Sequence, residues 1–477
     1  MRSYLFYDLE TSGLSPCFDQ VYQFAAIRTD AQLNILDQVE YAVQPTRDII
    51  PSPIAMLTHQ LPLELLLAGI PEHQAIANVH ALFNQAGTIS LGYNTLTFDD
   101  EFLRFNFYRH LLTPYTHQFK DGCGRMDILP MLVFYYLYKP DLLKWPMVEG
   151  KASLRLDALS KLNQLAEGQA HHAMVDVKAT HALARILQQE EKVWHYLLGF
   201  FNKEEEQQRF HALTTTIIDK HETKLGLMIY CKWGPALHYQ APVLCLGEHR
   251  HYRNQLCWLR LDQEELLSAD LEDIVEHAWV CNKKWAEPPF ILPLQPRFIK
   301  DPEKLELAQE IIAMLAAQPE LLEALQHHYL EYKHPVYPDT DIDAALYQIS
   351  FMSREDEYLS RKLHAAPAAA KSKIKAEFVS PDLQVLAERY LGRFYYEHLT
   401  AREQAKFDAY LADIYYREDV QIFDYTHKDS QKKLLRMEAL GQLQQEALPA
   451  GLKLEALTPV QAQRLRELEH YLRTLEV

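Results

Sequence analysis

The sequence predicts an α/β domain at the N-terminus, followed by a small all-β region and a helical C-terminal part. Three observations predict this order. β-Branched and aromatic residues dominate three runs at the start of the chain, "YLFYDLE", "VYQFAAIRTD" and "ILDQVEYAV". Similar short runs return between residues 220 and 295. Apolar residues at helical spacing prevail over most of the chain beyond residue 302.

The first three runs, within residues 4–43, predict strands of an antiparallel sheet, with turn residues between them. Apolar residues at helical spacing then predict a helix over 72–85, and "TISLGYN" (88–94) is typical of a short buried strand. Further helices are predicted at 97–111, 126–138, 153–163 and 173–190. A three-stranded start followed by alternating helix and strand indicates an α/β domain of about 190 residues.

The region 220–295 predicts a barrel-like or sheet-like unit of short strands, and 302–332 predicts helix. "KHPVYPDTD" (333–341) contains two prolines and reads as a linker. "HAAPAAAKSKIKAE" (364–377) is of low complexity and predicts an exposed connector. The rest is predicted to be helical, with a capping box at Thr400 and Glu403.

Composition predicts a globular protein. The 477 residues are 48% hydrophobic and 24% charged, and no apolar run has the length of a membrane span. The N-terminus reaches an acidic residue before a signal-peptide core could form, and the six cysteines contain no C-x-x-C pair, so we expect reduced thiols in the cytoplasm. A net charge of −17 argues against non-specific wrapping of duplex DNA, but it allows a groove lined by a few Lys and Arg.

Two acidic residues interrupt the first predicted strand, in "LFYDLETSGLSP". Side chains two positions apart in a strand point the same way, so Asp8 and Glu10 should lie side by side. Neighbouring carboxylates raise each other's pKa, and a divalent cation with oxygen ligands would neutralise them. From these residues alone, a metal site and an edge strand with a solvated acidic face are equally good readings.

Further acidic residues occur at two other places in the chain. Asp99 and Asp100 follow the predicted strand 88–94 at the mouth of a helix, where the helix dipole alone would favour acids. Asp176 lies in an amphipathic helix, in "AHHAMVDVKATHAL", near apolar neighbours. A buried acid without a partner is costly, which favours a functional role for Asp176.

Three blocks of this sequence, "FYDLETSGLSP", "GYNTLTFDDEFL" and "HHAMVDVKAT", resemble in order and spacing the motifs of the DEDD exonucleases. The spacing of His171 and Asp176 is that of the histidine subtype. The resemblance implies a ribonuclease H-like fold for the first domain. It also selects Asp99 over Asp100, because Asp99 directly follows Phe98. At the residue after the motif histidine, where the family usually has Asp or Asn, this chain has His172.

The resemblance assigns roles to five residues, here the carboxylates Asp8, Glu10, Asp99 and Asp176 and the base His171. It implies two Mg²⁺ ions, with Mn²⁺ able to substitute, roughly 3.5–4 Å apart. Asp8, Glu10 and Asp176 would bind one ion, Asp8 would bridge both, and Asp99 would hold the second through water. His171 would take the proton of the attacking water, and Glu10 would also receive the terminal 3′-OH.

The segments "QFAAIRTD", "SLRLDAL" and "YLGRFYYEHLT" resemble bacterial members of the family that add an SH3-like β domain and a helical C-terminal domain. This implies an exonuclease domain at 1–192, an SH3-like β domain with terminal helices at 193–338 and a helical domain at 339–477. It also implies a monomeric 3′-to-5′ exonuclease that degrades single-stranded DNA to 5′-mononucleotides in DNA repair and recombination. The implied protein partner is the acidic C-terminal tail of single-stranded-DNA-binding protein.

Contacts to the DNA strand are expected from cations and aromatic rings. Arg155 matches a substrate-binding arginine of the family, although it could be an ordinary helix-face residue. The other candidates are, in the first domain, Arg104, Tyr115, Phe119 and Arg125, and, at presumed loop tips of the β region, Arg250, Tyr252, Arg253, Lys283, Lys284 and Trp285. The competing functions are a 3′-to-5′ exoribonuclease, which the same five residues would serve, and an inactive nuclease fold used as a binding module.

Overall fold

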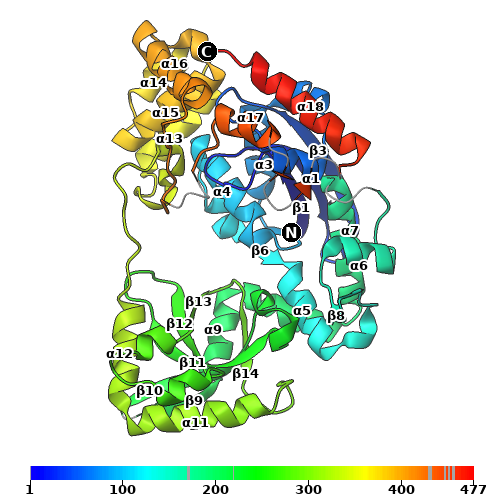
Figure 1. The fold of residues 1–477 in the computed structure, drawn as a ribbon, viewed down its shortest axis with the longest axis vertical. Helices are drawn as coiled ribbons and strands as arrows, with labels where there is room; N and C mark the ends of the chain where they lie inside the picture. The colour runs from blue at the N-terminus through cyan, green and yellow to red at the C-terminus, as the bar shows by residue number, and fades with distance from the viewer. Residues whose placement is uncertain are drawn as a thin grey trace. The chain divides into compact units, whose positions relative to one another are not determined.

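The computed structural model describes residues 2–168, 172–218, 220–427, 432–444, 447–448, 452–453 and 457–477. The chain forms two compact units, each built from separate segments (Figure 1). The first unit comprises Met1–Arg125, Ala166–His181 and Val336–Val477. The second comprises Met126–Leu165 and Ala182–Pro335.

A mixed sheet with the strand order β4-β3-β2-β1-β5-β6 forms the centre of the first unit. Its strands are β1 Ser3–Thr11, β2 Val21–Thr29, β3 Ile35–Gln44, β4 Ile70–Pro71, β5 Thr88–Gly92 and β6 Gly124–Asp127. The antiparallel start is confirmed, since β1 pairs with β2 and β2 with β3 in that sense. The strand β5 joins β1 in parallel, so both strands end at the same edge of the sheet.

The side chains on the two faces of β1 pack against different helices. Leu5, Tyr7 and Leu9 point into a core shared with the helices α3 (Glu72–Phe83) and α4 (Asp99–Arg109). Phe6, on the opposite face, contacts His181 of α7 (Ala173–Gln188), with ring centroids 5.2 Å apart. Because side chains alternate along a strand, Asp8 and Glu10 lie on the face that α7 covers.

A tight turn follows β1, which ends at Thr11. The Asp19 carboxylate accepts hydrogen bonds from the Ser12 hydroxyl (2.8 Å) and the Ser15 amide (2.9 Å). A Cβ atom on Gly13 would lie 2.4 Å from the same carboxylate, so only glycine fits there. The break at Ser12-Gly13 therefore follows from the close approach of Asp19.

Helices complete the first unit. Two short helices, α1 (Pro53–His59) and α2 (Leu63–Leu67), are not among the elements predicted from the sequence. The helical C-terminal part is confirmed, as is the capping box at Thr400 and Glu403. Its elements are α13 Arg354–Ala365, α14 Ala368–Lys375, α15 Pro381–Phe394, α16 Ala401–Tyr416, α17 Arg436–Gln444, β15 Ala447–Leu448, β16 Leu452–Lys453 and α18 Pro459–Thr474. The last helix, α18, lies beside α1 (Figure 1).

The predicted exposed connector at 364–377 is wrong, because much of it forms the helix α14. Lys371 and Lys375 are buried on it, 3% and 7% exposed. The ammonium of Lys371 donates to the carbonyl of Leu363, and that of Lys375 donates to Glu403. Alanine has the highest intrinsic helix propensity, so an alanine-rich stretch that can bury its lysine stems forms a helix.

A buried ion cluster joins the N-terminal and C-terminal segments of the first unit. Arg393 of α15 donates to Asp48 at 2.7 Å and also contacts Asp343. Both carboxylates are 0% exposed. Burial alone would raise the pKa of Asp343, but Arg393, Arg389 and Lys433 outweigh it and bring that pKa to about 2. The two acids are therefore ionised and depend on their cations.

We expect Arg393→Met to destabilise the protein by about 3–5 kcal/mol, because it leaves two buried carboxylates without their shared partner. Urea denaturation at pH 7 measures this change. The exposed Arg402 on α16 provides a matched control, and Arg402→Met should change the unfolding free energy by less than about 0.5 kcal/mol. Equal stability of the two variants would contradict the ionised state of the cluster.

The second unit confirms the all-β region, which forms an antiparallel sheet in the order β13-β12-β11-β10-β14, with β9 paired to β10. Its strands are β9 Thr214–Ile218, β10 His221–Ile229, β11 Gln240–Glu248, β12 Gln255–Arg260, β13 Val280–Lys284 and β14 Phe290–Pro293. The predicted helix at 302–332 is divided in two by Pro319.

The remaining elements of this unit are helices and a short hairpin. They are α5 Ile128–Tyr138, the strands β7 Met147–Val148 and β8 Lys151–Ala152, α6 Leu156–Asn163, α8 Glu191–Leu198, α9 Lys203–His211, α10 Ile274–His277, α11 Glu303–Ala317 and α12 Pro319–Leu330. The predicted linker 333–341 contains neither helix nor strand. In the described residues, no helix is long and apolar enough to span a membrane.

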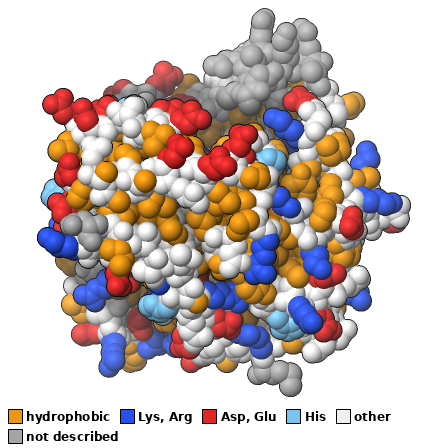
Figure 2. Space-filling model, turned by 90° about the horizontal axis from the view of Figure 1, so that it is seen from below, with side chains coloured by type: hydrophobic (Ala, Val, Ile, Leu, Met, Phe, Trp, Pro, Cys, Tyr) orange, Lys and Arg blue, Asp and Glu red, His pale blue; other side chains and the backbone are white. Residues whose placement is uncertain are grey.

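The surface carries charges of both signs. Figure 2 shows a face on which basic and acidic side chains are interspersed among hydrophobic ones. This agrees with the expectation, from a net charge of −17, that no uniformly basic surface is present on this face.

Candidate active site

Three carboxylates converge above the end of β1. The ligand oxygen atoms of Asp8, Glu10 and Asp176 all lie within 4.8 Å of one another. Asp8 and Glu10 come from alternate positions of β1, and Asp176 comes from the first turn of α7, which covers that face of the sheet. The pairing of Asp8 with Glu10 and the approach of Asp176 follow the arrangement that the sequence predicts.

These carboxylates oppose one another's ionisation. Burial, and then the charges of Asp99, Glu10 and Asp176, raises the pKa of Asp8 well above its usual range. Burial, followed by Asp176 and Asp99, raises the pKa of Glu10 to about 8. Negative charge is therefore concentrated in this site beyond what its own surroundings compensate.

Asp99 reaches the same site from the neighbouring strand. It is the first residue of α4, beyond the end of β5, and it is 6% exposed. Its carboxylate accepts a hydrogen bond from the amide of Leu9 at 3.2 Å, between Asp8 and Glu10. The parallel pairing of β1 and β5 explains this approach, since both strands end at one edge of the sheet.

The next residue, Asp100, has different surroundings. Its carboxylate contacts Arg125 (2.5 Å), Arg104 (2.8 Å) and His117 (3.2 Å). Burial alone would raise the pKa of Asp100, but these groups outweigh burial and lower it. Asp100 is therefore an anchor for the start of α4, whereas the charge of Asp99 acts on Asp8 and Glu10.

The residues present fit a divalent metal site. Carboxylate oxygens are the ligands that Mg²⁺ and Mn²⁺ prefer. Burial and neighbouring acids raise the pKa of Asp8 and Glu10, and among the described residues no cation offsets this effect. Within the described residues, no other group of three such side chains brings its ligand atoms this close.

His171, the predicted base, lies outside the described residues. Its neighbour His172 has a side chain that is 40% exposed, and its Nε2 lies 3.3 Å from Nε2 of Gln23. Gln23 and Glu40, which contact each other on the α7 face of the sheet, were missed by the sequence reasoning. Gln23 interrupts the apolar run "VYQFAAI", and a polar residue at the centre of such a run is a sign of a specific role.

The other predicted strand contacts differ in exposure. The side chain of Arg155, in the second unit, is 70% exposed and bonds Asp157. Phe119 is 70% exposed and Tyr115 is half-buried. Arg104 is buried, and its guanidinium contacts Asp100, Glu101 and the hydroxyl of Tyr347. This is the arrangement of a structural ion pair, in which the charge is already balanced.

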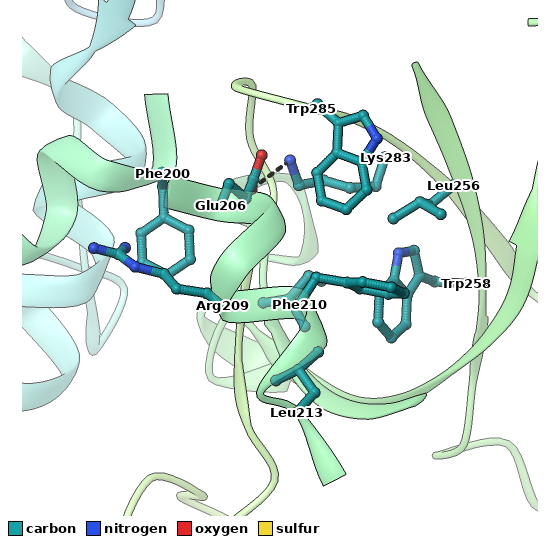
Figure 3. Close-up of a pocket in the computed structure, with 10 residues that line it drawn as sticks. Phe200, Glu206, Arg209, Phe210, Leu213, Leu256, Trp258, Lys283 and Trp285 are labelled. Carbon is teal, nitrogen blue, oxygen red and sulfur yellow. Dashed lines mark ion pairs between the residues drawn. The ribbon is translucent and has the colours of Figure 1, made fainter. Parts of the chain in front are cut away.

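Lys283 and Trp285 do not lie at an exposed loop tip, so that prediction is wrong. They are 1% and 7% exposed and line a small pocket in the second unit. Lys283 and Glu206 point toward each other there, and their charged atoms are 2.7 Å apart (Figure 3). Apolar residues that line the pocket, among them Leu256 and Trp258, surround the lysine stem, and the ion pair compensates its charge.

Two family matches cover most of this architecture. Residues 5–184 match the exonuclease family represented by RNase T, and residues 340–474 match the exonuclease I C-terminal domain. Residues 5–184 thus form a domain of the exonuclease family, and residues 340–474 form an exonuclease I C-terminal domain. The resemblance predicted from the three sequence blocks is confirmed.

Over most of its length the chain is similar to exodeoxyribonuclease I. It is 27% identical to that of Haemophilus influenzae over 464 residues, covering 91% of this chain and 96% of the relative. It is 26% identical to that of Escherichia coli over 474 residues, covering 93% of this chain and 98% of the relative.

Solved structures share the whole fold. Exonuclease I from Methylocaldum szegediense covers 100% of both chains with a TM-score of 0.84 and 26% identity. E. coli exonuclease I in complex with a dA16 oligonucleotide covers 100% of both chains with a TM-score of 0.83 and 23% identity. A structure of SSB/Exonuclease I does so with a TM-score of 0.81 and 24% identity.

Proposed function

We propose that this protein is a metal-dependent 3′-to-5′ exonuclease that degrades single-stranded DNA to 5′-mononucleotides, and that it serves DNA repair and recombination. The observation that carries the proposal is the convergence of Asp8, Glu10 and Asp176 within 4.8 Å, in a domain of the exonuclease family. Its relatives support DNA as the substrate, since E. coli exonuclease I, which shares the fold, has been solved with a dA16 oligonucleotide.

Each carboxylate has a proposed task. Asp8, Glu10 and Asp176 would hold one Mg²⁺, and Asp99, buried at the edge of the group, would hold a second through water. Mn²⁺ would bind the same oxygen ligands. When bound, such ions neutralise the phosphodiester charge and lower the pKa of water. The high charge density of the four carboxylates suits them to attract cations next to a polyanionic substrate.

The remaining assignments concern protons and the strand. His171 would accept the proton of the attacking water, because an imidazole exchanges protons near neutral pH. Glu10 would receive the terminal 3′-OH, which would start degradation at a 3′ end. Arg155 and Phe119 keep the exposed cation and ring surface that contacts with phosphates and bases require, and the half-buried Tyr115 would contribute the accessible part of its ring. Arg104 is not included, because its charge is balanced within the fold.

A protein partner is also proposed. The structure of SSB/Exonuclease I supports an interaction of this protein with single-stranded-DNA-binding protein. The acidic C-terminal tail of that partner is the expected contact.

A 5′-labelled oligonucleotide assay tests the proposal. Single-stranded DNA with Mg²⁺ should shorten stepwise from its 3′ end, and EDTA should stop the reaction. Duplex DNA should be degraded more slowly. Faster cleavage of an RNA oligonucleotide would instead establish an exoribonuclease. Strand binding without cleavage of either substrate would identify an inactive binding module.

A further inference from the structure

Gln23 is a buried amide in the middle of the sheet that carries the candidate site. It is 2% exposed, and it lies directly opposite Glu10 in the antiparallel register of β1 and β2. Directly opposite residues of antiparallel strands carry their side chains on the same face. Gln23 therefore shares the α7 face of the sheet with Asp8 and Glu10.

The hydrogen bonds of Gln23 fix the orientation of its amide. Its Oε1 accepts from the backbone amide of Ala173 at 3.1 Å, and its Nε2 donates to Oε1 of Glu40 at 2.7 Å. A backbone amide can only donate, and a carboxylate can only accept. The side chain thus connects two strands of the sheet with the first residue of α7.

The start of α7 needs such an acceptor. The first amides of a helix have no partner within the helix, and Ser, Thr, Asp or Asn at the N-cap usually supplies one. The residue that precedes α7 is His172, which is not among these. Gln23 supplies the acceptor instead, through the Oε1 atom that receives the amide of Ala173, while its Nε2 lies 3.3 Å from the ring Nε2 of His172.

The position of this hydrogen bond matters for the site. Asp176 lies three residues after Ala173, in the first turn of the same helix. Gln23 thus connects the strand position opposite Glu10 to the turn that carries Asp176. We propose that Gln23 is a positioning residue, which holds the start of α7 against the sheet so that Asp176 lies next to Glu10 and Asp8. This rests on the proposed function, because it assigns Gln23 to the metal site of that nuclease.

The variant Gln23→Met tests the proposal, since methionine has a similar length and makes no comparable hydrogen bond. Calorimetry with Mn²⁺ alone, on the full-length protein, should show a metal affinity weakened about tenfold, the size of one hydrogen bond near 1.4 kcal/mol. The Mg²⁺ concentration for half-maximal nuclease rate should rise similarly, while KM for the oligonucleotide changes less than about twofold.

Ala173→Pro removes the donor of the same hydrogen bond at a helix position that tolerates proline. The single variant Ala173→Pro should weaken Mn²⁺ binding as much as Gln23→Met does. The double variant should lose no more Mn²⁺ affinity than either single variant, because both changes remove the same hydrogen bond. Gln404→Met is the matched control. It removes a hydrogen bond of 3.0 Å from a glutamine to the carbonyl of Tyr396 on the C-terminal helices. It should leave Mn²⁺ affinity unchanged.

Several outcomes overturn the inference. Unchanged Mn²⁺ affinity in folded Gln23→Met, with only a lower unfolding temperature, would reduce Gln23 to a structural cap. If that variant does not fold, unchanged affinity in Ala173→Pro would have the same meaning. A wild-type protein that binds no Mn²⁺ would remove the proposed function and the inference with it. Mn²⁺ binding without nuclease activity would contradict the proposed function alone.

Discussion

Replacing Asp8 with asparagine is expected to abolish nuclease activity and, at the same time, to stabilise the metal-free protein. Burial, and then the charges of Asp99, Glu10 and Asp176, oppose the ionisation of Asp8 and raise its pKa. Asparagine has nearly the same shape and no charge, so it removes this repulsion together with a proposed metal ligand. The stability gain should be on the order of 1–3 kcal/mol at pH 8. The rate should fall at least about 10³-fold, as expected when several kcal/mol of charge stabilisation are lost.

Urea denaturation in EDTA and the oligonucleotide assay measure the two effects on the same preparation. The exposed Asp141 offers a control of the same chemistry, and Asp141→Asn should alter neither quantity. A less stable Asp8→Asn protein would show that the carboxylates do not repel one another. Retained activity would exclude Asp8 from the reaction.

The stability of the metal-free protein is expected to fall as the pH rises from about 7 to about 9, above the range in which the half-buried His73, His80 and His364 titrate. The pKa of Glu10 is about 8 in the folded protein, against 4.5 for a free side chain. The folded state therefore binds more protons than the unfolded state between these values. The stability that protonated Glu10 contributes is complete below about pH 4.5 and is lost as the pH rises through about 8. Asp8, whose pKa is also raised, acts in the same direction.

Mg²⁺ should reverse this loss, since a bound cation compensates the charges that deprotonation creates. Thermal unfolding with and without Mg²⁺ is the measurement, and the increase in unfolding temperature should be larger at pH 8.5 than at pH 5.5. The stabilisation by Mg²⁺ should be larger at pH 8.5 than at pH 5.5 by several kcal/mol of unfolding free energy. The variant Glu10→Gln should flatten the pH dependence of the metal-free protein. An Mg²⁺ effect that does not grow with pH would contradict the convergence of these acids on a cation.

The elements around the site were predictable because their patterns are local. A period of two residues predicts β1 and places Asp8 and Glu10 on one of its faces. A period of 3.6 residues predicts α7, which carries Asp176. The choice of Asp99 over Asp100 came from the family motif. The structure gives it a physical basis, since Asp100 is compensated by Arg125 and Arg104. The assignment of catalytic roles, and the domain boundaries at 192 and 338, stay predictions.

Features that depend on distant segments were not predictable. The role of Gln23 depends on the register of β2 and on the start of α7, which lies 150 residues further along the chain. Lys283 looked like a DNA contact because nothing near it in the sequence reveals Glu206 as its partner. The alanines around Lys371 predict a low-complexity connector, because the carbonyl that accepts from its ammonium lies in the preceding helix and has no local signal.

The division of the first unit into Met1–Arg125, Ala166–His181 and Val336–Val477 has a consequence for biosynthesis. The four carboxylates are all synthesised by residue 176, but one core of the same unit packs Leu411 and Leu468 of the last segment with Tyr22 and Met56. At roughly 5–20 residues per second, the ribosome delivers these tens of seconds later. In the meantime the second unit has its complete sequence, whereas the nascent nuclease exposes an apolar surface that chaperones would shield. A truncated chain that lacks the last helices therefore exposes this apolar surface to chaperones and proteases.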